Sequence, residues 1–116
     1  MSGRMVNNLI EVRQGDSFVI TLHLLKNSKD VDLSGITARM QVRDSAGIMQ
    51  WELTGESLDA TQGRLAFLIS PEQSSIEEGS YLCDIQLEMP DGSINTIFPA
   101  NVNQVGTFKI TKQITK

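Results

Sequence analysis

Two residues in this chain could form a nucleophile and its base: the single histidine, His23, and the single cysteine, Cys83. A histidine within hydrogen-bonding reach of a cysteine can withdraw its proton and leave a reactive thiolate. Each of the two lies within its own alternating strand pattern, and no spacing motif links them. We therefore predict that His23 is a surface residue and that Cys83 is a small buried apolar residue.

Carboxylates are the second source of chemistry, as acid and base pairs or as metal ligands. Glu77 and Glu78 fall at a turn, whereas Asp84 and Glu88 fall on the solvent face of a strand, so we interpret all four as solvated charges. The loop aspartates lack the close spacing of a calcium-binding loop; they are Asp30, Asp32, Asp44, Asp59 and Asp91. Weak cation binding at one such loop stays an open alternative. We predict no catalytic, cofactor-binding or metal-binding residues.

Charge and glycine patterns argue against nucleotides and nucleic acids. Gly92 and Gly106 are single glycines in turns and do not form a Gly-rich loop that opens a helix. The net charge is −4 and aromatic residues make up 5% of the chain. Four basic residues could line one sheet face, but no aromatic residue interleaves with them as a stacking platform; they are Arg39, Arg43, Lys109 and Lys112. We predict no nucleic-acid partner.

Length and composition bound the rest. The chain has 116 residues, of which 40% are hydrophobic and 21% charged. This is ordinary for one folded domain. No window reaches the roughly 18 to 20 apolar residues needed to span a bilayer, and Met1 to Asn8 lacks the apolar stretch of a signal peptide, so we expect neither membrane insertion nor export. One cysteine cannot form an internal disulfide, so packing alone must hold the fold.

The elements that must position these residues are short strands. Apolar and polar residues alternate with a period of two in successive segments, with turn-forming residues between them. The predicted strands are Leu9–Arg13, Phe18–Leu25, Ile36–Arg43, Met49–Leu53, Arg64–Ile69, Tyr81–Leu87, Ile94–Phe98 and Gly106–Thr111, the last continuing raggedly to Ile114, with a further short edge strand at Glu56–Leu58. The phase puts Met49, Trp51 and Leu53 inward, with Trp51 as a core anchor.

One segment departs from the strand pattern. Ser70 suits a helix N-cap, Pro71 the first helical position and Gln73 the reciprocal place in a capping box. We predict a single helical turn near Pro71–Ile76.

These elements predict an all-β fold. Seven or eight short strands with one helical turn favour an antiparallel, immunoglobulin-like β-sandwich over a parallel α/β arrangement. A small barrel is an alternative, because periodicity does not reveal how sheets close. We expect residues 1–8 to form a flexible N-terminal arm and residues 9–116 to form the sandwich domain.

A longer set of motifs resembles a known family. The run from Ser70-Pro71-Glu72-Gln73 through Gly79-Ser80-Tyr81 to Pro90-Asp91-Gly92 is more specific than a generic strand pattern. Together with Arg13-Gln14-Gly15-Asp16 and Asp32-Leu33-Ser34-Gly35, it is similar to short bacteriophage virion proteins and to the immunoglobulin-like domain of phage baseplate upper proteins. The resemblance covers roughly Ile10 to Ile110. Tyr81 also resembles the tyrosine corner of immunoglobulin-like domains, whose hydroxyl binds the backbone upstream.

The resemblance implies a phage virion structural or assembly protein. It would be a tail, baseplate or fibre-attachment module, or a capsid decoration or head-fibre component. It would not be an enzyme and would use no cofactor. Its partners would be other virion proteins, as a homo-oligomer or as many copies on a symmetric particle, without a membrane partner. Its place would be the virion, assembled in the host cytoplasm.

Two features separate the chain from its relatives. The long C-terminal extension with which baseplate upper proteins hold receptor-binding proteins has no counterpart here, so we expect the module alone. The connection Phe98–Gln104 is longer than the usual return, and we expect it to carry contacts particular to this protein.

The alternative function is a carbohydrate-binding or host-surface-binding adhesin module. Sandwich loops often carry recognition, but sugar binding usually requires exposed aromatic rings. Phe98, beside Pro99, is the one ring that the pattern puts in an exposed loop. We therefore rank this function below assembly.

Overall fold

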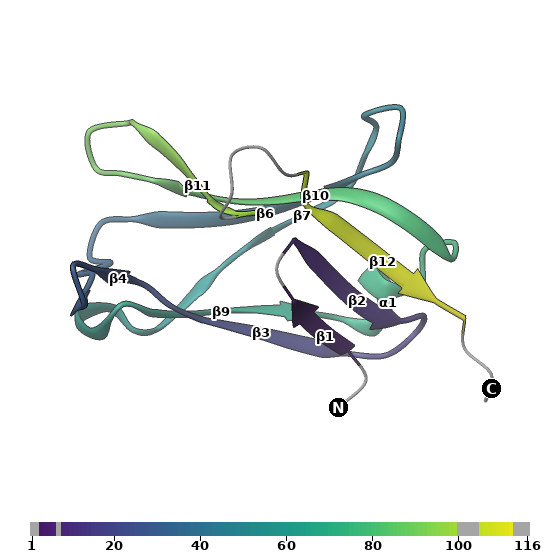
Figure 1. The fold of residues 1–116 in the computed structure, drawn as a ribbon, viewed down its shortest axis with the longest axis horizontal. Helices are drawn as coiled ribbons and strands as arrows, with labels where there is room; N and C mark the ends of the chain where they lie inside the picture. Colours follow the sequence, from purple (N-terminus) through teal and green to yellow (C-terminus); the bar gives the residue numbers. More distant parts are fainter. Residues whose placement is uncertain (1–2, 7, 100–104, 113–116) are drawn as a thin grey trace.

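The computed structural model describes residues 3–6, 8–99 and 105–112. Within these ranges the chain forms two sheets that pack face to face, with a β-hairpin at one end and a short helix at the other (Figure 1). The prediction of an all-β sandwich is confirmed. The expected continuation of the last strand to Ile114 and most of the connection after Pro99 lie outside the described residues.

The larger sheet contains seven strands. Its order along the sheet is β1 (Gly3–Val6), β2 (Leu9–Arg13), β12 (Thr107–Thr111), β10 (Gly79–Glu88), β6 (Thr37–Arg43) and β7 (Met49–Thr54), and β11 (Ile94–Phe98) also pairs with β10. One pair is parallel, that of β2 with β12, which corrects the expectation of a wholly antiparallel sheet. In this pair the first core strand and the last strand of the fold lie side by side and run in the same direction.

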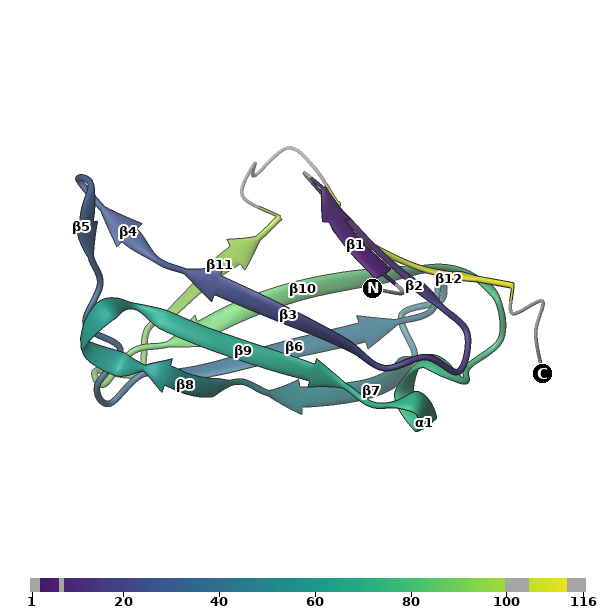
Figure 2. The same ribbon diagram turned by 90° about the horizontal axis from the view of Figure 1, so that it is seen from below.

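The smaller sheet lies against the larger one, as Figure 2 shows. Its order is β3 (Phe18–His23), β9 (Arg64–Ile69) and β8 (Glu56–Asp59). A 3₁₀ turn, Ala60–Gln62, links β8 to β9. Beyond β3, β4 (Leu25–Lys26) and β5 (Lys29–Asp30) form a separate hairpin. Strand number exceeds the expected seven or eight because of these short pieces.

The core lies between the two sheets and is formed by the inward residues of both. Alternation predicted most of its members, since β6, β9 and β10 bury every second side chain. The buried apolar residues are Ile10, Val12, Phe18, Ile20, Leu33, Ala38, Met40, Val42, Leu65, Phe67, Ile69, Cys83, Ile85, Leu87, Phe98, Phe108 and Ile110.

The inward phase predicted for β7 holds only in part. Met49 is 39% exposed, so its placement in the core was wrong. A register shift beside Arg43, opposite Met49, breaks the pairing of β6 with β7 there. Trp51 is half-buried and packs edge-on against Phe108, with ring centroids 5.4 Å apart. Its indole N–H donates to the Gln73 carbonyl at 3.0 Å, so Trp51 connects strand β7, at the edge of the core, to the helical turn.

The helical turn forms where the capping signals predicted it. Helix α1 spans Pro71–Ser74, between β9 and β10. The Ser70 hydroxyl accepts from the Gln73 amide at 3.2 Å, while the Gln73 side chain accepts from the Ser70 amide at 2.8 Å. Ser74, fully buried, donates its hydroxyl to the Asp16 carbonyl at 2.6 Å. The helix is thereby tied to the turn between β2 and β3.

Tyr81 forms the expected corner. Its hydroxyl donates to the carbonyl of Glu77, four residues upstream. This bond holds the turn that precedes β10 against the strand itself.

The segment expected to be a flexible arm contains a strand. Gly3–Val6 pairs antiparallel with Leu9–Val12 as strand β1, at the edge of the larger sheet. Residues 1–2 and 7 lie outside the described residues. The next residue, Asn8, bonds the far end of the chain: its carbonyl accepts from the Thr107 amide at 2.8 Å.

Strand β10 has two successive neighbours along one of its edges. Leu82 and the residues before it pair with β12, whereas Ile85 and the residues after it pair with β11. The opposite edge pairs with β6 from Leu82 to Glu88, the end of the strand. At the change of neighbour the Cys83 amide donates to the Gly106 carbonyl at 2.9 Å. A Cβ atom at Gly106 would overlap the Cys83 carbonyl oxygen and lie 2.9 Å from the Phe98 ring.

We predict that Gly106→Ala lowers the free energy of unfolding by about 3 kcal/mol, since the added methyl group meets backbone that cannot move aside. Urea denaturation followed by tryptophan fluorescence measures the change. Gly92→Ala is the control. Its methyl group meets no atom within 4 Å, so only the φ of 89° opposes it, at a cost of about 1 kcal/mol. Equal losses in the two variants would show that the close approach at Gly106 is unimportant.

Candidate functional site

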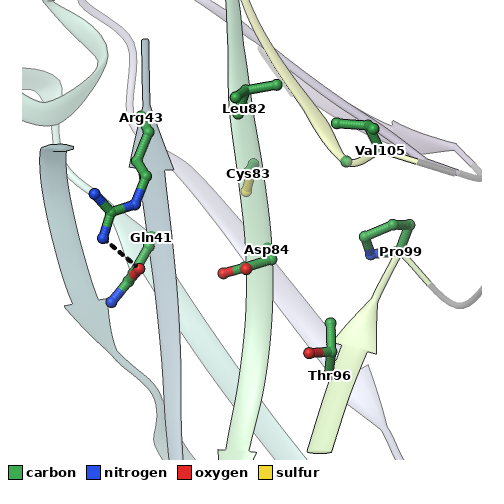
Figure 3. Close-up of a pocket in the computed structure, with 9 residues that line it drawn as sticks. Gln41, Arg43, Leu82, Cys83, Asp84, Thr96, Pro99 and Val105 are labelled. Carbon is green, nitrogen blue, oxygen red and sulfur yellow. Dashed lines mark hydrogen bonds between the residues drawn. The ribbon is translucent and has the colours of Figure 1, made fainter. Parts of the chain in front are cut away.

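The change of neighbour along β10 leaves a hollow on the outer face of the larger sheet. We call it the β10 hollow (Figure 3). Its volume is about 300 Å³ and its lining is mainly apolar. The lining residues are Gln41, Arg43, Leu82, Cys83, Asp84, Thr96, Pro99, Val105 and Gly106. They come from β6, β10, β11 and the approach to β12.

Exposed apolar side chains form the rim of this hollow. Leu82 is 40% exposed and Val105 is 62% exposed. Leu82 occupies an outward position of β10, where the alternation otherwise places polar residues. This rim was not predicted from the sequence, although an apolar residue in the outward phase, Leu82, was its visible signal.

On the β6 side, the polar groups of the hollow are fixed by hydrogen bonds. The Arg43 guanidinium donates to the Gln41 side-chain oxygen at 3.1 Å and to the Gly47 carbonyl at 3.0 Å. The Gln41 amide nitrogen donates in turn to the Glu52 carboxylate on β7. Arg43 is therefore held along its own hairpin, as Figure 3 shows for its bond to Gln41.

Asp84 is the unsatisfied polar group of the hollow. Its Oδ1 atom is buried, and no hydrogen-bond donor among the described residues reaches it. Loss of solvation raises the pKa of the Asp84 carboxyl, and the nearby positive charge of Arg43 only partly offsets this. Asp84 was expected to be a solvated charge, and the burial of its Oδ1 atom corrects that expectation.

His23 and Cys83 do not meet. His23 lies on β3 in the smaller sheet, where its Nε2 atom is 2.7 Å from the Asp30 carboxylate. Cys83 lies on β10 in the larger sheet, and its thiol is buried. Burial raises the pKa of that thiol far above its usual range, so the reactive thiolate is disfavoured. The predicted surface position of His23 and buried position of Cys83 are both confirmed.

Several other acidic residues bond to groups close by. Asp32, Asp44 and Asp91 each accept backbone N–H groups from their own turns. Glu88 pairs with Arg39 at 2.6 Å. Within residues 3–6, 8–99 and 105–112, no group of three or more His, Cys, Asp or Glu side chains could hold a metal ion.

Basic side chains on the larger sheet alternate with acidic ones. In addition to the pair of Arg39 with Glu88, Lys109 lies 3.9 Å from Glu11 on the neighbouring strand. Lys112 is exposed just beyond β12. This face therefore presents mixed charge and no continuous basic surface of the kind that tracks a nucleic-acid backbone.

The aromatic side chains are buried or half-buried. Phe98 is only 4% exposed, so the expectation of an exposed loop ring at this position was wrong. Its side chain turns into the core at the end of β11. Trp51 and Tyr81 are half-buried and the other three phenylalanines are buried. None of the described helices is long and apolar enough to cross a membrane.

The amino-acid sequence places the chain among known proteins. Residues 2–113 match the family described as the BppU N-terminal domain. No curated protein matches the chain.

Two solved structures are similar in fold. The N-terminal domain of ORF48 from phage TP901-1 superimposes with a TM-score of 0.53 at 17% identity, covering 89% of this chain and 82% of that one. CopC from Methylosinus trichosporium OB3b gives a TM-score of 0.47 at 14% identity, with 84% and 79% covered.

We predict that Asp84→Asn stabilises the protein at pH 7. The pKa of Asp84 is raised in the folded state, so the folded protein binds more protons than the unfolded chain, and stability falls as pH rises through this window. The gain is about 0.5 kcal/mol, since the half-buried group is partly screened by solvent, and it vanishes below the ordinary aspartate pKa of about 3.9. Urea denaturation at pH 7 and pH 3 measures it.

Asp91→Asn is the control for this measurement. Hydrogen bonds from Ser93 lower the pKa of Asp91, so its charge stabilises the folded state above that pKa and the stabilisation is lost as pH falls. The two substitutions therefore change stability at pH 7 in opposite directions. A loss of stability in Asp84→Asn would show that its carboxylate is satisfied in solution.

Proposed function

Because this chain belongs to the family of BppU N-terminal domains, we propose that it is a structural module of a phage baseplate that assembles through protein–protein contacts. BppU is the baseplate upper protein of tailed phages. The family match, which covers nearly the whole chain, is the observation that carries the proposal. A phage structural component fits a fold whose described residues are dominated by strands and turns.

The partners that this function requires are other proteins of the virion. We propose that many copies occupy a symmetric particle, either as a homo-oligomer or on equivalent sites, after assembly in the host cytoplasm. Many copies on one particle allow individually weak protein–protein contacts to give a stable assembly, because binding at one contact raises the effective concentration of the partner at the next. The mechanism is geometric, and the buried thiol of Cys83 and the distant His23 support a role without catalysis.

The surfaces suited to such contacts lie on the larger sheet. Its outer strands β1, β7 and β11 each have one neighbour among the described strands, so each offers backbone groups to a partner. The β10 hollow is lined in part by Thr96 of β11, and it adds an apolar rim to this surface. A sugar-binding role gains no support, because each aromatic ring is buried or half-buried.

We predict that purified virions contain this chain and that cryo-electron microscopy locates it at the baseplate. A short epitope tag inserted between Asn27 and Ser28, at the tip of the β4–β5 hairpin, would mark its position without altering the larger sheet. Untagged virions serve as the control. Density at capsid symmetry axes would instead identify a decoration or head-fibre protein, and absence of the chain from virions would refute the structural role.

We further propose that residues 1–8 act as an assembly arm. Among the residues before Ile10 whose burial the structure describes, Met5, Asn8 and Leu9, none is buried, so we expect the core to form without the arm. Deletion of residues 1–7 keeps Asn8, whose carbonyl accepts from the Thr107 amide. We expect this variant to unfold cooperatively with a melting temperature within about 5 °C of the parent, and to enter virions several-fold less well. Quantitative mass spectrometry of purified particles measures incorporation, and an unchanged level would contradict the arm's role.

A further inference from the structure

We propose that strand β11 pairs antiparallel with β11 of a second copy of this chain, so that two larger sheets join edge to edge about a twofold axis at Asn95. The pairing itself rests on the structure of the strand. Its use in a particle rests on the proposed function.

The first argument is the open edge of β11. Within the described residues β11 pairs only with β10, and Figure 1 shows their hairpin projecting at one corner of the molecule. The Ser93 carbonyl accepts from the Met89 amide at 2.8 Å, so it points toward β10. Because successive residues of an antiparallel ladder alternate in direction, the backbone N–H and C=O groups of Ile94 and Thr96 point to the open edge. Such groups are a template for another strand.

The second argument is that β11 lacks the protection usual at a sheet edge. Natural edge strands often discourage pairing with charged side chains. Of the outer strands of the larger sheet, β1 contains Arg4 and β7 contains Glu52, whereas β11 contains no charged residue. The first three residues of β11 are exposed, and Ile94 is 47% exposed. A strand on the open edge would contact these side chains on both faces of the sheet.

The third argument is that the strand complements itself. With Asn95 on the twofold axis, Ile94 of each copy lies opposite Thr96 of the other. Both residues point to the edge, so each of these pairs exchanges backbone hydrogen bonds. Their β-branched side chains meet on the outer face, which Thr96 shares with the β10 hollow, and such cross-strand pairs are favourable. No charged residue lies opposite another in this register.

Asn95 favours a second copy over an unrelated strand. Asparagine is depleted in strands, yet Asn95 lies opposite Leu87 in the inward phase of β11. Leu87 is buried, whereas Asn95 is exposed. A residue on the axis of an isologous contact meets itself, and an amide suits this position because it donates and accepts at once. A single self-complementary asparagine also fixes register and copy number in coiled coils.

The first test is sedimentation equilibrium of the full chain. One strand from each copy makes a small contact, so we expect a monomer–dimer equilibrium with a dissociation constant of about 1 mM. Ile94→Lys brings like charges together across the axis and should weaken association by about tenfold. Leu68→Lys is the matched control, because it adds the same charge at a 59% exposed, outward position of the smaller sheet. Both variants alter exposed side chains and should keep the urea midpoint of the parent.

Cysteine cross-linking tests the register. Non-hydrogen-bonded neighbours in an antiparallel pair have Cα atoms about 4.5 Å apart, a separation that a disulfide spans. Asn95→Cys should therefore form a covalent dimer in oxidised glutathione. Thr96→Cys lies opposite Ile94 and should react several-fold more slowly, while the native Cys83 is buried in both variants. Equal rates would overturn the register centred on Asn95.

Two results would overturn the pairing: a monomer at every concentration up to that expected constant, or equal weakening by Ile94→Lys and Leu68→Lys. Neither depends on where the protein resides. When the two variants compete during phage assembly, we expect Ile94→Lys to be under-represented in virions. Equal representation would overturn the use of the pairing in the particle. Absence of both variants and of the parent chain from virions would refute the baseplate role alone.

Discussion

The two-neighbour edge of β10 is the constraint on which the rest of the larger sheet depends. One long strand must complete its hydrogen bonds with β12 along its first part and with β11 along its last part. The backbone at Gly106 therefore comes so close to Cys83 that no side chain fits there. The β10 hollow opens beside this crossing.

Local signals in the sequence predicted the elements well. Strand alternation gave β2 and β9 with the bounds that the structure has, because every second side chain of each is buried. The bounds of β11 followed from the turn signal that precedes it, although only Phe98 of this strand is buried. The helical turn followed from Ser70, Pro71 and Gln73, since capping is satisfied within a few residues. The tyrosine corner followed from Tyr81 for the same reason, as its hydroxyl bonds a carbonyl only four residues away.

Long-range pairing was beyond these signals. Periodicity tells which side of a strand faces inward but not which strand lies beside it. The parallel pair of β2 with β12 and the divided edge of β10 were therefore not predicted. Phe98 was misplaced because its neighbour Pro99 indicated a loop, whereas the ring turns into the core. Asp84 was in the predicted outward phase, yet its Oδ1 atom is buried, because its carboxylate points toward Gln41 on β6, a strand far away in the sequence.

The parallel pair of β2 with β12 also has a mechanical consequence. Leu9 lies beside Thr107 and Arg13 beside Thr111, so the two strands run in the same direction. Tension that pulls the start of β2 away from the end of β12 acts along the strands and loads their hydrogen bonds in shear. Bonds loaded in this way share the force and must break together, which raises the barrier to forced unfolding. The parallel pair therefore resists stretching of the domain between these two strands.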